Sequence, residues 1–385
     1  MGNILLVDTN FSSAPIYDHL INIGHEVYVC GNNPEDFLAK YVEKYIQINY
    51  SDIPLMRKLI NELSIDYIVP GCNDRSYQTC SVLSQEFNFC GMDNQETTEL
   101  LNNKYKFRTY VGRASLPAPR LIGDLARKKL PPTPYIVKPV DAFSGRGITI
   151  VKSKVGSELE KAIDVAKQYS PTNSYVIEQF VSGQLYSHSA FISKQQIQTD
   201  FIVKEYGSAN PFVVDSSFVQ ADFDKVLLNR IRSAVTYIAQ DLNLVDGLFH
   251  TQFICNGDEF WIIEVTRRCP GDLYSYLIEL STGYPYAQAY AFNFINKRMP
   301  LPILKNSNLL ILRHTISQPI ESIFKSIRFN QPVCIERFVP LHVIGDNVPA
   351  SPFGRIGLVF IESKTLDELV ATLQLVLDRR LYKLN

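Results

Sequence analysis

The chain has 385 residues, 46% of them hydrophobic, and a formal net charge of -1 at neutral pH. This length is enough for two to four packed units, each with its own core. A near-neutral chain without a long run of like charges lacks the electrostatic footprint that duplex nucleic acid or an anionic membrane surface requires. No stretch approaches the roughly 20 apolar residues that span a bilayer, so we expect no membrane partner.

The amino terminus and the cysteines favour a cytoplasmic protein. Residues 2–8 form a short apolar run that ends in an acid, unlike a charged leader followed by a long apolar segment. The seven cysteines are scattered and lack the short paired spacing of a zinc site. We therefore expect reduced thiols that pack as small apolar groups.

The first part of the chain alternates short apolar runs with helical patterns, which predicts a parallel, doubly wound sheet. The turn at residues 8–13 lacks the glycines of a dinucleotide fingerprint, so we expect no nicotinamide or flavin cofactor. Asn73 and Asp74 follow the fourth strand, where open α/β sheets bind ligands, although a helix cap is an equal interpretation. The predicted strands are Ile4–Val7, Glu26–Cys30, Tyr45–Ile48 and Tyr67–Val69, and the predicted helices are Ala14–Ile23, Pro34–Lys44 and Pro54–Leu63.

A connecting helix over Glu96–Val111 and a proline-rich stretch up to Pro134 mark a boundary, after which a compact α+β lobe is predicted. Lys138 ends its first strand, and the following loop carries Gly145 and Gly147, where backbone amides can approach a phosphate. A glycine-bearing hairpin turn beside a surface lysine would have the same sequence pattern. The lobe's strands are Tyr135–Lys138, Ile148–Lys152 and Tyr175–Glu178.

The second half of the chain is predicted to be mainly antiparallel. Within it, a hairpin ends in Glu264-Val265-Thr266-Arg267-Arg268, where alternation places a carboxylate suited to a metal beside a cation suited to phosphate. The predicted strands are Ser187–Ile192, Ile197–Lys204, Phe249–Cys255, Phe260–Val265, Leu309–His314, Val333–Pro340 and Ile356–Glu362, and the helices are Phe223–Leu242, Pro285–Asn296 and Thr365–Leu377.

Residues 176–183 form an apolar strand that opens into an acidic and aromatic hinge, suited to an adenine ring. The order of Lys138, this hinge and Glu264-x-Thr266-x-Arg268 resembles the ATP-grasp superfamily of carboxylate-amine ligases over nearly the full chain. The resemblance implies an α/β and α+β fold, in which a doubly wound pre-ATP-grasp domain precedes a two-lobed clamp and a C-terminal extension. The implied domains are 1–95 (pre-ATP-grasp), 96–116 (connecting helix), 117–183 (small lobe), 184–299 (large lobe) and 300–385 (extension packed on the large lobe).

The resemblance implies an ATP site between the two lobes. Lys104 and Lys138 would contact the α- and β-phosphates, with Lys106 on a solvated helix face as the competitor of Lys104. The family usually has an acid for the ribose seven residues after Glu178, and here that position is Leu185. Ser144, Gly145 and Gly147 would belong to the loop that closes over the γ-phosphate, and Glu178, Gln179, Phe180 and Val181 would bind adenine.

The resemblance also implies a Mg²⁺ (or Mn²⁺) site built from Gln252, Glu264 and Thr266. Gln252 stands where a first carboxylate is usual, and Thr266 stands where an asparagine is usual. Gln252 still offers a carbonyl oxygen and Glu264 can bridge two ions, so these departures weaken the site without abolishing it.

This metal assignment requires Gln252 and Glu264 to lie on one face of the hairpin. A plain two-residue turn at Asn256-Gly257 would place Gln252 opposite Trp261 and turn Glu264 to the other face. We therefore predict an odd loop that includes Asp258, with Gly257 left-handed.

Arg268 is the predicted catalytic cation, together with Lys138, because the arginine fork binds two phosphate oxygens at once. Arg267, one position away, should face elsewhere as a structural ion-pair residue. His250 could act on the incoming amine, although single histidines on strands are more often packing residues. Asn73, Asp74, His250 and Arg355 are the further candidates for the substrate pocket.

The resulting hypothesis is an ATP- and magnesium-dependent enzyme that activates a small carboxylate as an acyl phosphate and joins it to a small amine. The alternative is a nucleotide-binding or sensor protein that has lost this chemistry, suggested by Leu185, Gln252 and Thr266. A carbon dioxide-fixing carboxylase ranks lower, because the chain has no carrier segment for biotin. Relatives of this kind often pair, which leaves a homodimer open, and the sequence names neither substrate.

Overall fold

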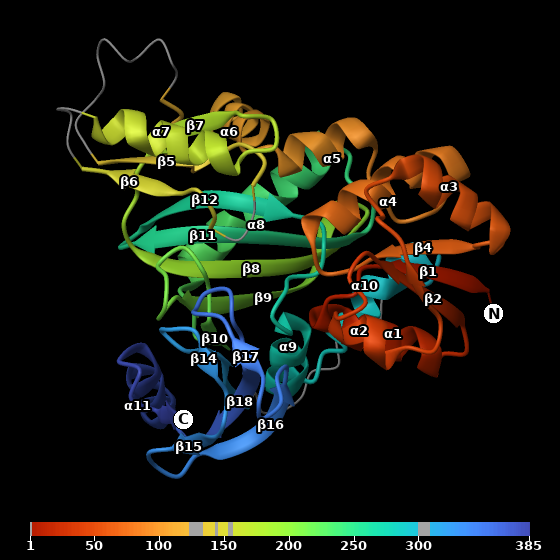
Figure 1. Cartoon of the computed structure of the whole chain (residues 1–385). Helices are drawn as coiled ribbons and strands as arrows, with labels where there is room; N and C mark the ends of the chain where they lie inside the picture. The colour runs from red at the N-terminus through yellow and green to blue at the C-terminus, as the bar shows by residue number, and fades with distance from the viewer. Residues whose placement is uncertain (1, 123–133, 143–144, 153–156, 299–308) are drawn as a thin grey trace.

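A computed structural model describes residues 2–122, 134–142, 145–152, 157–298 and 309–385. Figure 1 shows a small sheet above a large one, with the N-terminal domain beside the large sheet and the C-terminal region below. Among the described residues, no helix combines the length and apolar character that a membrane crossing needs. Ser144, a predicted phosphate contact, lies outside the described residues.

The N-terminal domain is built on a parallel sheet of four strands in the order β3-β2-β1-β4, as the alternating pattern predicts. The central strand β1 is apolar because helices cover both faces, and Ile4–Val7 are fully buried. Its elements are Asn3–Val7 (β1), Ala14–Asn22 (α1), Glu26–Gly31 (β2), Phe37–Tyr41 (α2), Tyr45–Gln47 (β3), Ile53–Glu62 (α3), Tyr67–Pro70 (β4) and Asp74–Phe87 (α4).

The predicted connecting helix is in fact two helices, Gln95–Asn102 (α5) and Lys104–Arg113 (α6). Asn103 breaks the run because its backbone is extended, with φ -87° and ψ 114°. Its side chain accepts a hydrogen bond from the backbone N–H of Lys106 and so caps α6. The break makes Lys104 the first residue of a new helix.

The small lobe is an antiparallel sheet in the order β6-β5-β7 with one helix packed on it. Val137 and Ile177 belong to the core under that helix. Alternation therefore turns Lys138 and Glu178 to the opposite face, toward α6 and the large sheet. The elements are Tyr135–Pro139 (β5), Thr149–Val151 (β6), Glu158–Tyr169 (α7) and Tyr175–Gln179 (β7).

The large sheet has eight strands in the order β12-β11-β8-β9-β10-β13-β18-β16 and is antiparallel throughout. Lys225–Asp241 (α8) covers one face, and Tyr274–Thr282 (α9) and Tyr286–Phe294 (α10) pack on the other. Its strands are Gln184–Ser193 (β8), Gln196–Tyr206 (β9), Ser216–Val219 (β10), Gly247–Asn256 (β11), Glu259–Thr266 (β12), Leu310–Ile316 (β13), Cys334–Pro340 (β16) and Gly357–Ser363 (β18).

In the C-terminal region, strands β13, β16 and β18 continue the large sheet. Leu366–Leu377 (α11) packs on these strands, with Thr365 capping its first turn. Two short strand pairs complete the region: Ser322–Ile323 (β14) with Asn347–Val348 (β17), and Ile327–Phe329 (β15) with Tyr382–Leu384 (β19).

Candidate active site

The β11–β12 hairpin places Gln252 directly opposite Glu264, so both side chains lie on one face as predicted. The expected odd loop is wrong, however. Asn256 pairs with Glu259, which leaves a two-residue turn whose first residue, Gly257, is left-handed with φ +57°. The extra residue is Ile263, because the register shifts between the Phe253–Ile262 and Gln252–Glu264 pairs. A bulge in β12, and not an odd loop, thus places Gln252 and Glu264 on one face.

A second carboxylate, Glu205 of β9, lies on the same face as Gln252. The amide Nε2 of Gln252 donates to Oε2 of Glu205 over 2.8 Å, and Glu205 is only 4% exposed. Burial raises the pKa of Glu205 to about 7, while hydrogen bonding to Ser187 and the charge of Arg313 oppose the shift. Sequence reasoning missed this residue because only the pairing of β9 with its neighbours, 47 residues from Gln252, brings it to the site.

Thr266 and His250 pair with each other two residues further along the hairpin from Gln252 and Glu264. The hydroxyl of Thr266 accepts a hydrogen bond from the backbone N–H of Arg268 over 3.3 Å. His250 is 5% exposed, and its Nδ1 lies 2.7 Å from the hydroxyl of Ser189. Burial lowers the pKa of His250 to about 3, with the charge of Arg268 acting in the same direction. This environment fits a packed, neutral imidazole.

Arg268 and Asp74 meet across the boundary between the large sheet and the N-terminal domain. Nε and Nη2 of Arg268 donate to the two carboxylate oxygens of Asp74 over 3.0 and 3.1 Å. Asp74 opens α4, and Asn73 caps that helix by accepting from the N–H of Ser76 over 2.8 Å. Both interpretations of this motif therefore fit: Asn73 is a cap, and Asp74 lies beside the predicted catalytic cation. Arg267 points elsewhere, into a buried ion pair with Asp93 at 2.7 Å.

The ammonium group of Lys138 donates to Oε2 of Glu178 over 2.9 Å. Glu178 is fully buried, and Arg108 of α6 binds the same carboxylate. Burial acts to raise the pKa of Glu178, but Lys138 and Arg108 hold it below its usual value. The side chain of Glu178 thus anchors cations.

The other hinge residues lie beside the linker that precedes β5. The backbone N–H of Gln179 donates to the carbonyl of Arg120 over 2.9 Å, and that of Phe180 donates to the carbonyl of Pro134 over 3.4 Å. Val181 is 7% exposed. The predicted adenine segment therefore runs beside residues 120 and 134, which both precede the small lobe's first strand.

Lys104 and the glycine loop lie at the junction of the lobes. Nζ of Lys104 donates to the carbonyl of Ala142 over 2.6 Å, so this ammonium group lies under the loop. Burial lowers the pKa of Lys104, and the charges of Glu264, Lys138, Asp74 and Glu178 also act on it. These four charged groups therefore lie within electrostatic reach of Lys104.

The glycines of that loop are required by the backbone. Gly145 and Gly147 have φ +69° and +70°, in the left-handed region. A side chain at Gly145 would also collide with the backbone carbonyl of Phe212, in the turn between β9 and β10. The loop thus reaches from the small lobe to the large one.

Arg355, a predicted substrate contact from the C-terminal part of the chain, lies beside the segment that follows Arg268. Its Nη1 binds Asp272, four residues after Arg268. A second arginine, Arg313, donates to the carbonyl of Asp272 over 2.9 Å and to the hydroxyl of Ser217 over 2.8 Å. Sequence reasoning missed Arg313 because only the pairing of β13 with β10 places it beside this segment.

The oxygen ligands on this face suit a hard divalent cation. The amide Nε2 of Gln252 donates to Glu205. This orientation leaves the carbonyl oxygen of Gln252 available to a cation beside Glu264. Mg²⁺ prefers such oxygen ligands and is usually held by one or two carboxylates together with substrate phosphates. In the described part of the chain, no cluster of three or more His, Cys, Asp or Glu side chains forms a metal cage. The arrangement fits a cation shared with a nucleotide.

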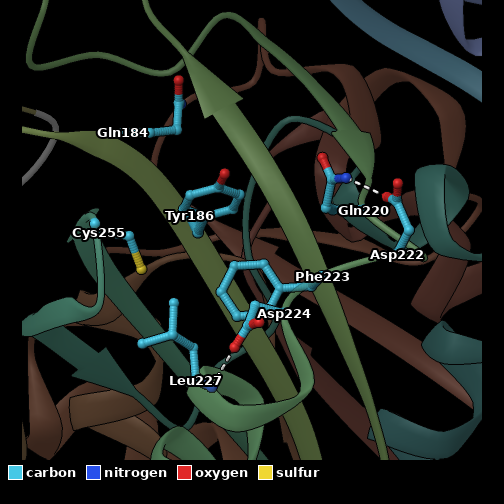
Figure 2. Close-up of a pocket in the computed structure, with 9 residues that line it drawn as sticks. Gln184, Tyr186, Gln220, Asp222, Phe223, Asp224, Leu227 and Cys255 are labelled. Atoms are coloured by element: carbon cyan, nitrogen blue, oxygen red, sulfur yellow. Dashed lines mark hydrogen bonds between the residues drawn. The ribbon is translucent and has the colours of Figure 1, made fainter.

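A pocket of about 350 Å³ lies on the opposite, α8-covered side of the large sheet (Figure 2). Tyr186 in this pocket stacks on Phe253 at 5.6 Å, and both alternate with Ser187 and Gln252 on the site face. Figure 2 shows Asp222 accepting from Gln220, and Asp224 accepting from the N–H of Leu227 in the first turn of α8. The pocket contains none of the predicted site residues.

Residues 131–275 match the sequence model of the ATP-grasp domain family. The chain carries an ATP-grasp domain. The matched range includes Lys138, the glycine loop, the hinge and the β11–β12 hairpin, whereas Lys104, Asp74, Arg313 and Arg355 lie outside it.

The ATP-grasp assignment agrees with similar proteins. The chain is 28% identical over 176 residues to a D-alanine–D-alanine ligase of Sulfurovum sp., covering 43% of this chain and 49% of that protein. The chain spans less than half the length of the curated relatives that it matches.

Two solved structures match the whole chain and confirm the predicted fold class. An L-amino acid ligase from Bacillus licheniformis has a TM-score of 0.82 at 18% identity, with 100% of this chain and 98% of that chain covered. The biotin carboxylase domain of the Hydrogenobacter thermophilus 2-oxoglutarate carboxylase, in complex with MgADP and bicarbonate, has a TM-score of 0.78 at 14% identity, covering 100% and 90%. At these identities the likeness shows the fold.

Proposed function

We propose that this ATP-grasp protein is an ATP-dependent ligase that activates a small carboxylate and joins it to a small amine. The observation that carries the proposal is that the ammonium group of Lys104, which donates to the carbonyl of Ala142 over 2.6 Å, lies near the charges of Lys138, Glu264 and Asp74, from three further elements (β5, β12 and α4). Phosphoryl transfer needs positioned cations and a dry cleft more than a protein nucleophile. This arrangement supplies cations for the phosphates and a carboxylate, Glu264, for a metal ion.

The proposed chemistry has two steps. A carboxylate oxygen of the substrate attacks the γ-phosphorus of ATP, the bond to the β-phosphate oxygen breaks, and ADP leaves with an acyl phosphate formed. The lone pair of the amine then attacks the acyl carbon, the bond to the phosphate oxygen breaks, and phosphate and a proton are released. Closure of the two lobes would exclude water from the acyl phosphate.

Most of the predicted residues have a place in this scheme, whereas Asn73, a helix cap, and His250, a packed imidazole, have none. Lys104 and Lys138 would hold the α- and β-phosphates, and the hinge at residues 178–181 would hold adenine. The amides of Gly145 and Gly147, with Ser144, would cover the γ-phosphate. Arg268 would bind the transferred phosphoryl group, with Asp74, Arg355 and the nearby Arg313 at the substrate side.

Gln252 and Glu264 would hold Mg²⁺ or Mn²⁺ through their side-chain oxygens, with Thr266 as the weakest of the three predicted ligands. When bound, the cation neutralises charge on the β- and γ-phosphates. The hydroxyl of Thr266 already accepts a hydrogen bond from Arg268, which supports this ranking.

Comparable proteins support the substrate class. The D-alanine–D-alanine ligase and the L-amino acid ligase are both named as ligases, and the carboxylase domain was solved with MgADP. We extend the proposal to a cytoplasmic enzyme that acts on small molecules, with a homodimer as one expected form. The domain limits at residues 95, 116, 183 and 299 belong to the same proposal.

The test is to incubate the protein with ATP, Mg²⁺ and a panel of amino acids and amino sugars, and to measure ADP and phosphate. Release of both that depends on an acid and an amine supports the ligase. Changing Glu264→Gln should abolish that release while leaving the thermal unfolding transition in place. Undiminished turnover in this variant would reject the assignment.

The alternative is a nucleotide-binding protein without ligase chemistry, favoured by the glutamine at 252 and by the occupied hydroxyl of Thr266. Such a protein would be stabilised by ATP and Mg²⁺ yet release no phosphate with any member of the panel. The same experiment therefore separates the two.

A further inference from the structure

Arg108 of α6 carries a buried guanidinium that binds both lobes of the molecule. It is 3% exposed. Its Nε and Nη2 donate to the two carboxylate oxygens of Glu178 over 3.2 and 3.4 Å. Its Nη1 and Nη2 donate to the backbone carbonyls of Ile262 and Ile263 over 2.6 and 2.7 Å. One side chain thus joins the connecting helix to both lobes.

The two carbonyls that Arg108 binds identify the bulge in β12. In a regular strand, consecutive carbonyls point to opposite sides, so one planar group does not bind both. Ile262 and Ile263 present theirs to the same guanidinium because the register shifts at this point. Arg108 therefore contacts the backbone where the strand departs from regular pairing.

This departure determines where Glu264 points. Without the extra residue, Gln252 would lie opposite Ile263, and Glu264 would turn toward the face covered by α8. With it, Glu264 lies opposite Gln252 on the face that carries Glu205. The contact with Arg108 is thus one residue away from the predicted metal carboxylate.

Arg108 is also linked to Lys138, because both side chains bind the carboxylate of Glu178. Glu178 is fully buried and receives Arg108 and Lys138 together, with Lys138 at 2.9 Å. A buried carboxylate needs such cations, and loss of one partner changes the position of the other. The ammonium group of Lys138 is therefore held through a carboxylate that Arg108 shares.

We propose that Arg108 is a positioning residue that aligns Glu264 of the large lobe with Lys138 of the small lobe. The proposal rests on the proposed function, since it assigns these two residues to the cation and the phosphates. A purely structural role is the competing explanation. The two explanations differ in what they predict for divalent cation binding in protein that is still folded.

The test compares the full-length wild type with R108K and R108Q. Lysine keeps one positive charge for Glu178, but a single ammonium group does not reproduce four hydrogen bonds to four acceptors. Mn²⁺ binding is measured by electron paramagnetic resonance at a saturating level of a non-hydrolysable ATP analogue. R267K is the matched control, because Arg267 is also 3% exposed at its side chain and also binds a carboxylate and a backbone carbonyl.

We expect R108K and R108Q to weaken Mn²⁺ binding at least tenfold, and R267K to change it less than twofold at a comparable loss of thermal stability. Trp261, the one tryptophan of the sequence, lies in β12, and its fluorescence should shift in the Arg108 variants alone. Mn²⁺ affinity within twofold of wild type in a folded Arg108 variant would overturn the inference, as would an equal loss in R267K. If neither Arg108 variant folds, Glu178→Gln replaces them, with the same tenfold and twofold limits.

Failure of the proposed function gives a different result. Wild-type protein would then either bind neither the analogue nor Mn²⁺, or bind both and release no phosphate from ATP with any acid and amine of the panel. Wild-type binding with an unaffected Arg108 variant rejects only the positioning role.

Discussion

Arg268 binds Asp74 through both carboxylate oxygens of Asp74, at 3.0 and 3.1 Å, and so links the ATP-grasp domain to helix α4 of the N-terminal domain. Two candidate residues that lie 194 positions apart in the sequence thereby form one group. Because Asp74 neutralises Arg268, a transferred phosphoryl group must compete with Asp74 for the guanidinium or share it.

We predict that R268K lowers kcat about 100-fold, since a lysine cannot bind Asp74 and a phosphoryl oxygen in the same planar geometry. The measurement is ADP release at saturating ATP and substrates. R267K should retain activity, because Arg267 is paired with Asp93 away from the site. Equal activity of R268K and wild type would remove Arg268 from the mechanism.

A second prediction separates Lys104 from Lys106. K104M should weaken ATP binding about tenfold or more, because a charge-assisted hydrogen bond to phosphate is worth roughly 1.5–3 kcal/mol. K106M should change ATP affinity less than about twofold, since Lys106 forms an exposed pair with Glu99 and such pairs contribute about 0–1 kcal/mol. Titration calorimetry with an ATP analogue measures both. The reverse ranking would assign the phosphate contact to Lys106.

A third prediction concerns the missing carboxylate at position 252. Gln252→Glu would place two carboxylates where the amide of Gln252 now donates to Glu205 at 2.8 Å. At pH 8, above the pKa of Glu205, the two like charges should destabilise the folded protein by about 1–3 kcal/mol in EDTA, and added Mg²⁺ should restore stability. Urea unfolding with and without Mg²⁺ measures the difference. Gln252→Met, which adds no charge, should show no gain from Mg²⁺ beyond that of wild type.

A fourth prediction follows from the raised pKa of Glu205, about 7 in the folded protein against 4.5 when unfolded. The folded state keeps this proton across that window, so the stability from Glu205 is fully present below about pH 4.5. It is lost as the pH rises through 7, by up to about 3 kcal/mol. In EDTA, wild type should therefore lose stability relative to E205Q between pH 5 and 8. Parallel pH profiles of the two proteins would contradict the buried, protonated state.

The sequence predicted the fold where the signal is local. The parallel strands of the N-terminal domain, the hairpin and α8 follow from apolar periodicity, and each appears within a few residues of its expected limits. The connecting helix was wrong because Asn103, a residue that helices tolerate, instead caps a second helix. Local patterns do not decide between those two uses of asparagine.

The site was less predictable because its decisive features depend on contacts between distant residues. The bulge at Ile263 is held by Arg108, 155 positions earlier, and nothing in the hairpin sequence signals it. Glu205 and Arg313 reach the site only through strand pairing in the large sheet. Lys104, Lys138 and Glu264 were predicted from the resemblance to the family, whereas Asp74 was predicted from its place after the fourth strand of the parallel sheet. The charges of Lys138, Glu264 and Asp74 act on Lys104, and Arg268 binds Asp74.

The continuous large sheet has a practical consequence for protein production. A fragment limited to residues 131–275 would lack β13, which pairs with β10 through Ser216–His314, Ser217–Arg313 and Phe218–Leu312. The unpaired backbone of β10 would then offer a template to strands of neighbouring molecules. We expect such a fragment to aggregate on expression, and we expect the intact C-terminal region to be required for a soluble, homogeneous sample.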